Sequence, residues 1–172
     1  MAATDSARDI RIFETAEEVA RAAADYFVET ADKSISAQGR FSVALAGGST
    51  PRRTYQLLAS EEYRNRLPWS KVHIFFGDER SVPATHADSN YRMAEEAMIS
   101  LLPIPEPNLH RMVGEGDAVA NASLYEGELR AFFDSAIWPR LNLVLLGMGD
   151  DGVNPLWNKK QPARVSLGRK IL

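Results

Sequence analysis

Three short apolar segments constrain the fold of this chain more than any other feature. They are FSVALA (residues 41–46), VHIFF (72–76) and LNLVLL (141–146). A strand with one face in water alternates apolar and polar residues, whereas a strand of a parallel sheet is covered on both faces and shows a continuous apolar run. The three segments therefore predict parallel strands with helices on both faces of their sheet.

Amphipathic stretches occupy the sequence between these strands. Thr15 and Glu18 form a capping box at the start of the first, and Gly39 stops it. The spacing of apolar residues predicts helices over about residues 15–36, 51–60, 88–101 and 117–135. A further short strand is expected at residues 10–13. Since strands alternate with helices, we predict an α/β fold with an open, mainly parallel, Rossmann-like sheet.

Composition and charge narrow the functional classes. The 172 residues are 45% hydrophobic and 25% charged, which is enough apolar material for a globular core. The net charge of −3 gives no reason to expect a nucleic acid or a membrane as partner. The absence of cysteine excludes disulfides, thiolate metal sites and a cysteine nucleophile. Because no apolar run approaches the ~18 residues of a membrane span, we expect a soluble, cytoplasmic protein.

Charge is distributed unevenly along the chain. Residues 153–172 contain five of the 20 basic residues and none of the 23 acidic ones. This segment also holds two prolines and has neither a strand period nor a helix period. We therefore expect an α/β domain over residues 1–152, followed by an atypical, irregular basic tail over residues 153–172.

The first candidate site is the loop after residues 41–46. Gly47 and Gly48 let the backbone turn its N–H groups toward one point, and the hydroxyls of Ser49 and Thr50 add donors at the start of a helix. This arrangement favours a phosphate group. The alternative is a tight turn with a capping hydroxyl. No Walker lysine is present, which argues against a nucleoside triphosphatase.

The second candidate site follows residues 72–76. Asp78, Glu79 and Arg80 emerge together, so the arginine can bind a substrate anion, and a carboxylate can accept a hydrogen bond from a hydroxyl group or transfer a proton. The alternative is a solvated turn with one local ion pair. Asp78 is a possible catalytic residue. His73 and His110 are expected to be structural, because neither has a second metal ligand at a suitable spacing.

The third candidate site is GMGDDG (residues 147–152), which matches the pattern of a dinucleotide-binding loop. Asp150 and Asp151 would stand where a pyrophosphate needs donors, so a nicotinamide or flavin cofactor is not expected. Carboxylates in this position suit the hydroxyl groups of a sugar, and we assign Asp151 to substrate binding. We expect neither a cofactor nor a metal ion.

Four segments together resemble 6-phosphogluconolactonases of the pentose phosphate pathway. They are ALAGGSTPRRTYQLL (44–58), VHIFFGDERSVPATHADSNYRMAEEAMISLLPIPEPNLHRM (72–112), ASLYEGELR (122–130) and LNLVLLGMGDDG (141–152). The resemblance implies hydrolysis of 6-phospho-D-glucono-1,5-lactone to 6-phosphogluconate, with the GGST loop holding the phosphate and Arg80 binding substrate. Related sugar-phosphate isomerases and deaminases share the fold, but the GDER and SNYRMA motifs favour the lactonase.

The resemblance stops at Gly152. The family continues there with a histidine, its proposed general base, whereas this chain has Val153. The C-terminal third of the family fold is therefore expected to be missing, through truncation, a shifted reading frame or natural variation, and activity to be impaired. The alternatives are a sugar-phosphate isomerase or deaminase and a non-catalytic phosphosugar-binding fragment. An exposed strand edge would then favour self-association.

Overall fold

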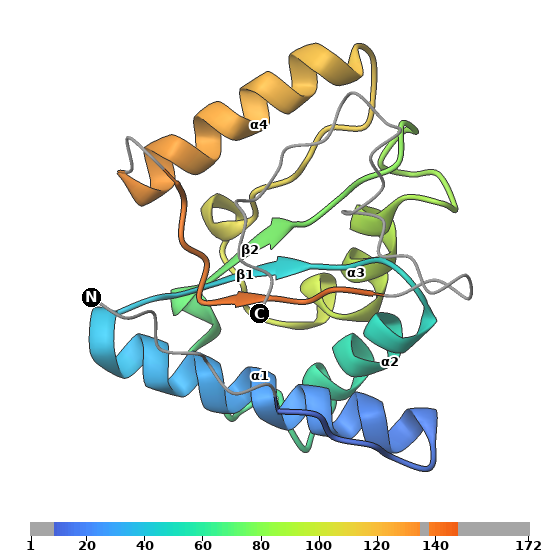
Figure 1. Cartoon of the computed structure of the whole chain (residues 1–172), viewed down its shortest axis with the longest axis vertical. Coiled ribbons are helices and arrows are strands. Elements are labelled where there is room, and N and C mark those ends of the chain that lie inside the picture. Colours follow the sequence, from blue (N-terminus) through green and yellow to red (C-terminus); the bar gives the residue numbers. More distant parts are fainter. Residues whose placement is uncertain (1–8, 135–137, 148–172) are drawn as a thin grey trace.

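A computed structural model describes residues 9–134 and 138–147 of the chain. Within these ranges helices lie on both sides of a three-stranded sheet, with α1 and α2 on one face and α4 on the other (Figure 1). The strands are β1 (Phe41–Leu45), β2 (Val72–Phe76) and β3 (Leu143–Val144). The α-helices are α1 (Ala16–Gln38), α2 (Ser49–Leu58), α3 (Asn90–Ala97) and α4 (Ala118–Phe133), and 3-10 helices occupy Trp69–Lys71, Ile99–Leu101 and Glu106–Asn108.

The described sheet is parallel throughout, which confirms the expected fold class. Its strand order is β2-β1-β3. Leu45 pairs with Phe76, so β1 and β2 end at the same level, and β3 pairs with β1 at Val43 and Ala44. The loops that follow these strands therefore lie together at the carboxyl ends of the strands, where open α/β sheets bind their ligands.

Burial on both faces explains why β1 and β2 lack polar alternation. Phe41, Val43 and Leu45 of β1 belong to the larger core, which they share with residues of α1, α2 and α3. The residues that point to the opposite face meet α4. This second core consists of Ala44, Phe75, Tyr125 and Leu129. Each strand thus contributes to both cores, as the apolar runs predicted.

Local capping accounts for the ends of two helices. Thr15 and Glu18 form the expected capping box at the start of α1, and Gly39 ends that helix with a left-handed φ of 79°. Ser89 caps α3 by accepting from the N–H of Arg92. α3 ends at Ala97 and is followed by a 3-10 turn, so it is shorter than the predicted helix.

Two of the expected strands differ from the structure. Residues 10–13 form no strand, and the side chains of Ile10 and Ile12 are 78% and 91% exposed. β3 comprises only Leu143 and Val144, and Val144 is 38% exposed instead of buried. Among the described residues no strand pairs with the outer side of β3, so β3 is an edge strand of the described sheet.

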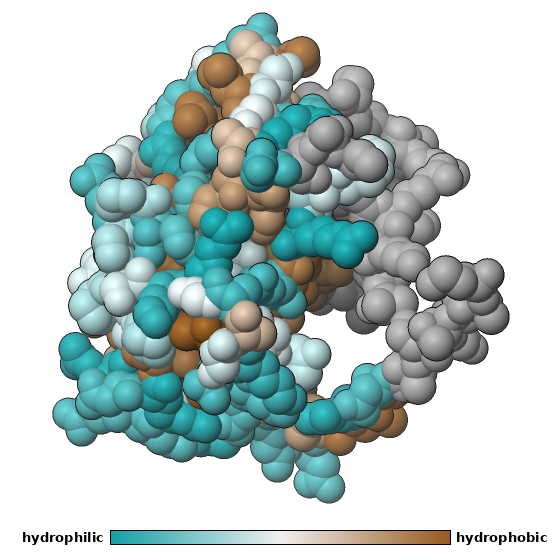
Figure 2. All heavy atoms as spheres, turned by 90° about the vertical axis from the view of Figure 1, so that its left-hand side faces the viewer, coloured by the Kyte–Doolittle hydropathy of each residue, from teal (hydrophilic) through white to brown (hydrophobic). Residues whose placement is uncertain are grey.

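Apolar side chains also remain exposed on α4. They gather in the upper part of the surface, where this helix lies (Figure 2), and include Val119 and Leu124 at 65% and 72% exposure. These residues face away from the second core. In the described ranges, no helix has both the length and the apolar character needed to cross a membrane.

Candidate functional site

The loop between β1 and α2 supplies no side-chain cap for the start of α2. Gly48 is the N-cap residue and has no side chain to accept a hydrogen bond, and within residues 9–134 and 138–147 no side-chain cap is found for this helix. Gly48 has a φ of +113°, a conformation that L side chains rarely adopt. Ser49 and Thr50 follow in the exposed first turn. The partial positive charge of the α2 N-terminus is therefore available to an anion.

The backbone of this loop lies against the Asn90 side chain at the start of α3. A Cβ at Gly47 would lie 2.0 Å from Oδ1 of Asn90, so only glycine fits there. Asn90 is buried, and its Nδ2 donates to the backbone oxygen of Asp78 at 3.1 Å and to Oδ1 of Asp78 at 3.3 Å. Asn90 therefore holds the Gly47 loop and Asp78 together.

The Glu79 carboxylate holds the start of α3. It accepts hydrogen bonds from the backbone N–H groups of Asn90 at 2.7 Å and Tyr91 at 2.9 Å, and from the Ser89 hydroxyl at 3.1 Å. The N–H of Arg80 also donates to it, at 2.8 Å. These bonds occupy a carboxylate that the sequence had grouped with Asp78 and Arg80 as a candidate for substrate binding, and they make Glu79 a structural residue.

A pocket of about 410 Å³ lies between α2 and α3. Gly48 and Ser49 lie on its α2 side, and Arg80 lies on the other. Its remaining lining residues are Arg52, Arg53, Gln56, Ala87, Asp88, Ser89, Asn90 and Met93. Arg53 is paired with Glu17, so the pocket combines the N-terminus of α2 with the guanidinium groups of Arg52 and Arg80. This combination favours a small anionic ligand.

The loop that carries Arg80 is anchored from the far side by the segment before α4. A Cβ at Gly114 would lie 2.2 Å from the backbone oxygen of Arg80, so the two backbones touch. The Glu115 carboxylate accepts from the N–H of Ala84 at 3.0 Å and pairs with Arg111. These two contacts, the first being the stronger, lower the pKa of Glu115 to about 2. The Arg80 loop is thus fixed at both ends.

The two expected structural histidines contact each other beneath α4. Nδ1 of His73 lies 3.3 Å from Nε2 of His110, and Nδ1 of His110 lies 2.7 Å from Oε1 of Glu128. The His110 ring stacks on Phe75 with 4.1 Å between centroids. Burial, followed by the proximity of His110, lowers the pKa of His73 to about 4. No group of three or more potential metal ligands occurs among the described residues.

The structure brings only some of the sequence-predicted site residues to one pocket. Gly48, Ser49 and Arg80 line it, whereas Gly47, Thr50 and Asp78 belong to the same two loops but are not among its lining residues. Asp151 and Val153 lie outside the described residues. Sequence reasoning missed the contacts of Tyr55 and Tyr125 with the ends of β1 and β2.

Comparison with known proteins identifies the relatives of this fold. The profile of the family described as glucosamine-6-phosphate isomerases/6-phosphogluconolactonase matches residues 14–170. The chain belongs to this family. It is 43% identical to the 6-phosphogluconolactonase of Nostoc sp. over 130 residues, covering 74% of this chain and 52% of that protein. It is 45% identical to the 6-phosphogluconolactonase of Synechocystis sp. over 123 residues, covering 70% and 50%.

Solved structures of the family show the same arrangement. The 6-phosphogluconolactonase of Trypanosoma brucei matches with a TM-score of 0.76 at 31% identity, covering 88% of this chain and 64% of that one. This likeness confirms the family and the α/β class that the four sequence segments indicated. The chain spans about half the length of the curated family members it matches.

Proposed function

We propose that this family member binds 6-phosphorylated sugar lactones and acts as a 6-phosphogluconolactonase. The observation that carries the proposal is the uncapped first turn of α2, which borders a pocket that Arg80 also lines. A helix N-terminus binds anions through its backbone N–H groups, and a guanidinium adds a charge-assisted hydrogen bond. A phosphate group satisfies both at once.

The residues of the two loops have different roles in this proposal. The GGST residues and Arg80 are assigned to the 6-phosphate, and Asp78, which accepts a hydrogen bond from Asn90, is assigned to the reacting end of the substrate. Hydrolysis adds the oxygen of water to C1 of the lactone, and the ring oxygen leaves as the C5 hydroxyl after taking up a proton. Asp78 is a candidate for moving that proton. Asp151 is proposed to accept hydrogen bonds from the sugar hydroxyls.

Turnover is expected to be slow. The resemblance to the lactonases places Val153 where they have a histidine, and loss of a general base removes a factor of about 10²–10⁴ from the rate. Binding does not require that base. The chain should therefore bind the product 6-phosphogluconate even where it hydrolyses the lactone poorly.

The alternatives use the same anion site. The family description includes glucosamine-6-phosphate isomerases, and a sugar-phosphate isomerase or deaminase would also place a phosphate at α2. A phosphosugar-binding chain without catalysis is the third reading. The curated relatives with 43% and 45% identity are named as lactonases, and this supports the lactonase reading.

The proposal also covers the cellular location, the partners and the self-association of the protein. We infer a cytoplasmic enzyme with a small sugar phosphate as its ligand and no nucleic-acid partner. β3 contains Val144, which is 38% exposed, and the outer side of this strand has no paired strand among the described residues. That edge is where self-association is expected.

Calorimetric titration tests the binding step. The full chain should bind 6-phosphogluconate and leave unphosphorylated gluconate unbound. Arg80→Ala should weaken binding by roughly 1.5–3 kcal/mol, the scale of a hydrogen bond to a charged group. Arg64→Ala provides the control, because Arg64 is exposed and does not line the pocket. Equal affinity for the phosphorylated and unphosphorylated acids would refute the anion site.

Measurements of turnover distinguish the lactonase from the isomerase or deaminase and from a non-catalytic binding protein. Lactone hydrolysis is measured against the spontaneous rate in buffer, and glucosamine 6-phosphate is tested in parallel. Acceleration of lactone hydrolysis alone supports the lactonase, whereas turnover of the amino sugar alone supports the isomerase or deaminase. Phosphosugar binding without either reaction would identify a non-catalytic binding protein.

A further inference from the structure

Two buried tyrosines make matching contacts at the ends of the two strands that carry the site. The Tyr55 hydroxyl donates to the backbone oxygen of Ala46 at 2.9 Å and accepts from the N–H of Ala46 at 3.0 Å. The Tyr125 hydroxyl donates to the oxygen of Phe76 at 3.1 Å and accepts from its N–H at 2.9 Å. Each hydroxyl therefore binds both polar groups of one backbone residue.

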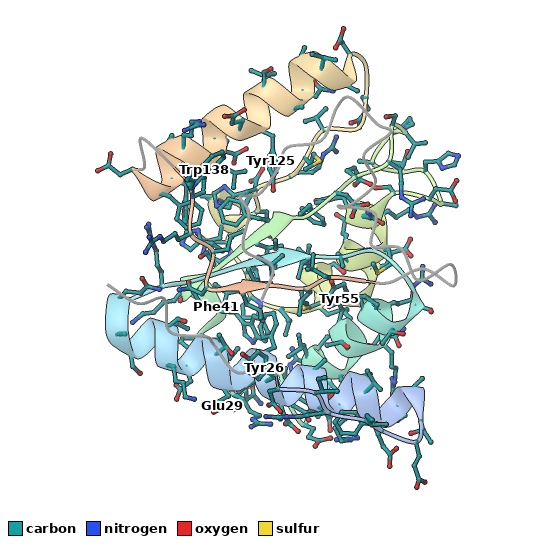
Figure 3. All side chains as sticks on the ribbon, viewed as in Figure 1. Tyr26, Glu29, Phe41, Tyr55, Tyr125 and Trp138 are labelled. Atoms are coloured by element: carbon teal, nitrogen blue, oxygen red, sulfur yellow. The ribbon has the colours of Figure 1, made fainter. Side chains whose placement is uncertain are left out.

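The tyrosines approach the sheet from opposite faces. Tyr55 belongs to α2 and the larger core, whereas Tyr125 belongs to α4 and the second core. Figure 3 shows Tyr125 above the sheet, under α4, and Tyr55 below it. Ala46 directly precedes Gly47, and Phe76 directly precedes Gly77. The two contacts thus lie at the points where the strands pass into the GGST loop and the Asp78–Arg80 loop.

We propose that Tyr55 and Tyr125 are positioning residues, which set the two ligand-binding loops through the last backbone groups before them. Packing alone does not require these hydroxyls, because phenylalanine would fill nearly the same volume in either core. Without the hydroxyl, however, the buried N–H and C=O groups of Ala46 or Phe76 lose their partner. Such groups are costly to leave unsatisfied, so the strand end would shift or open.

The state of the hydroxyls supports this role. Burial raises the pKa of both tyrosines well above the ordinary range, and the carboxylates of Asp78 and Glu128 act in the same direction on Tyr55 and Tyr125 respectively. Both side chains therefore remain protonated at any physiological pH. Each hydroxyl thus keeps the proton that it donates to the strand end.

A third buried tyrosine provides a matched control. Tyr63 is 1% exposed, but its hydroxyl donates to the side chain of Asp25, at 2.9 Å, and not to a loop of the site. Tyr63→Phe removes the same atom from a comparably buried ring. It should lower stability without affecting either loop.

Amide hydrogen exchange, followed by NMR on the full chain, tests the proposal directly. In Tyr55→Phe, exchange of the Ala46 N–H should accelerate about tenfold, as expected when a net stabilisation near 1.4 kcal/mol is lost, while that of Phe76 stays close to wild type. Tyr125→Phe should show the reverse pattern, and Tyr63→Phe neither. Equal acceleration at both sites in every variant, or none at either, would overturn the proposal. If one variant does not fold, the other decides the outcome.

The link to substrate rests on the proposed function and has its own readout. Tyr55→Phe and Tyr125→Phe should each weaken 6-phosphogluconate binding about fivefold to tenfold, and Tyr63→Phe by less than about twofold. Unchanged affinity in both variants, with wild-type binding intact, would overturn the positioning role. Failure of the wild-type chain to bind 6-phosphogluconate would instead refute the proposed function, and the exchange pattern would still decide whether the tyrosines set the loops.

Discussion

The contact between Gly47 and Asn90 predicts that an alanine at residue 47 destabilises the protein, whereas an alanine in place of Gly127 should stabilise it. An alanine Cβ at residue 47 would lie 2.0 Å from Oδ1 of Asn90 and 2.7 Å from its Cγ. Neither distance is compatible with van der Waals radii, so the Asn90 side chain or the loop must move. Asn90 has little freedom to do so, because it is buried and holds Asp78.

The magnitude follows from the atoms involved. Overpacking of this kind costs about 1–3 kcal/mol, and displacement of the Asn90 amide would add about 1 kcal/mol for its lost hydrogen bonds. Gly47→Ala should therefore lower the free energy of unfolding by roughly 2–4 kcal/mol. The clashing atoms all belong to the Asn90 side chain. In the Asn90→Ala background, Gly47→Ala should lower the free energy of unfolding by at least about 1 kcal/mol less than it does in the wild-type background. This difference is the coupling energy between the two sites.

Urea denaturation of the four proteins in this cycle measures the coupling. Gly127→Ala is the control, since Gly127 lies inside α4 and an added Cβ meets nothing within 4 Å. It should stabilise the protein by up to about 1 kcal/mol through helix propensity. Equal destabilisation by Gly47→Ala with and without Asn90 would refute the steric argument.

Two further predictions concern the loops and the histidine pair. Glu79→Gln should lower the free energy of unfolding, measured by urea denaturation, by about 1.5–3 kcal/mol, because the backbone N–H groups at the start of α3 lose a charged acceptor. An effect below about 0.5 kcal/mol would contradict the capping role. Since the pKa of His73 is lowered from 6.5 to about 4 in the folded state, the unfolded chain binds more protons in that range, and stability should fall as the pH drops from 6.5 to 4. Urea titrations across this range should show a flatter dependence in His73→Gln, and an unchanged dependence would rule out His73 as its source.

The sequence predicted the fold where local signals and burial agree. The apolar runs at 41–46 and 72–76 became β1 and β2, because each has one core on either face. Residues 10–13 show the limit of the same reasoning. Three of these four residues are apolar and have strand propensity. A strand also needs a partner with free backbone groups, and no partner can be identified from the residues themselves.

The loops of the candidate site could be predicted from the sequence, whereas the contacts that hold these loops in place could not. The glycines after β1 and the charged residues after β2 identify the carboxyl ends of these strands as the place where the loops converge. The cap formed by Glu79 and the backbone contacts of Tyr55 and Tyr125 depend on where distant segments pack. Glu79 cannot be distinguished from Asp78 by sequence alone, since both are carboxylates on one turn. Only the position of α3 separates the structural residue from the candidate for chemistry.

The central claim is that the first turn of α2 holds the phosphate of the ligand, and a crystal structure of the full chain with 6-phosphogluconate tests it most directly. The account predicts phosphate oxygens within hydrogen-bond distance of the backbone N–H groups of Ser49 and Thr50, with the Arg80 guanidinium on the same group. A phosphate bound away from α2, with Ser49 and Thr50 facing only solvent, would contradict it.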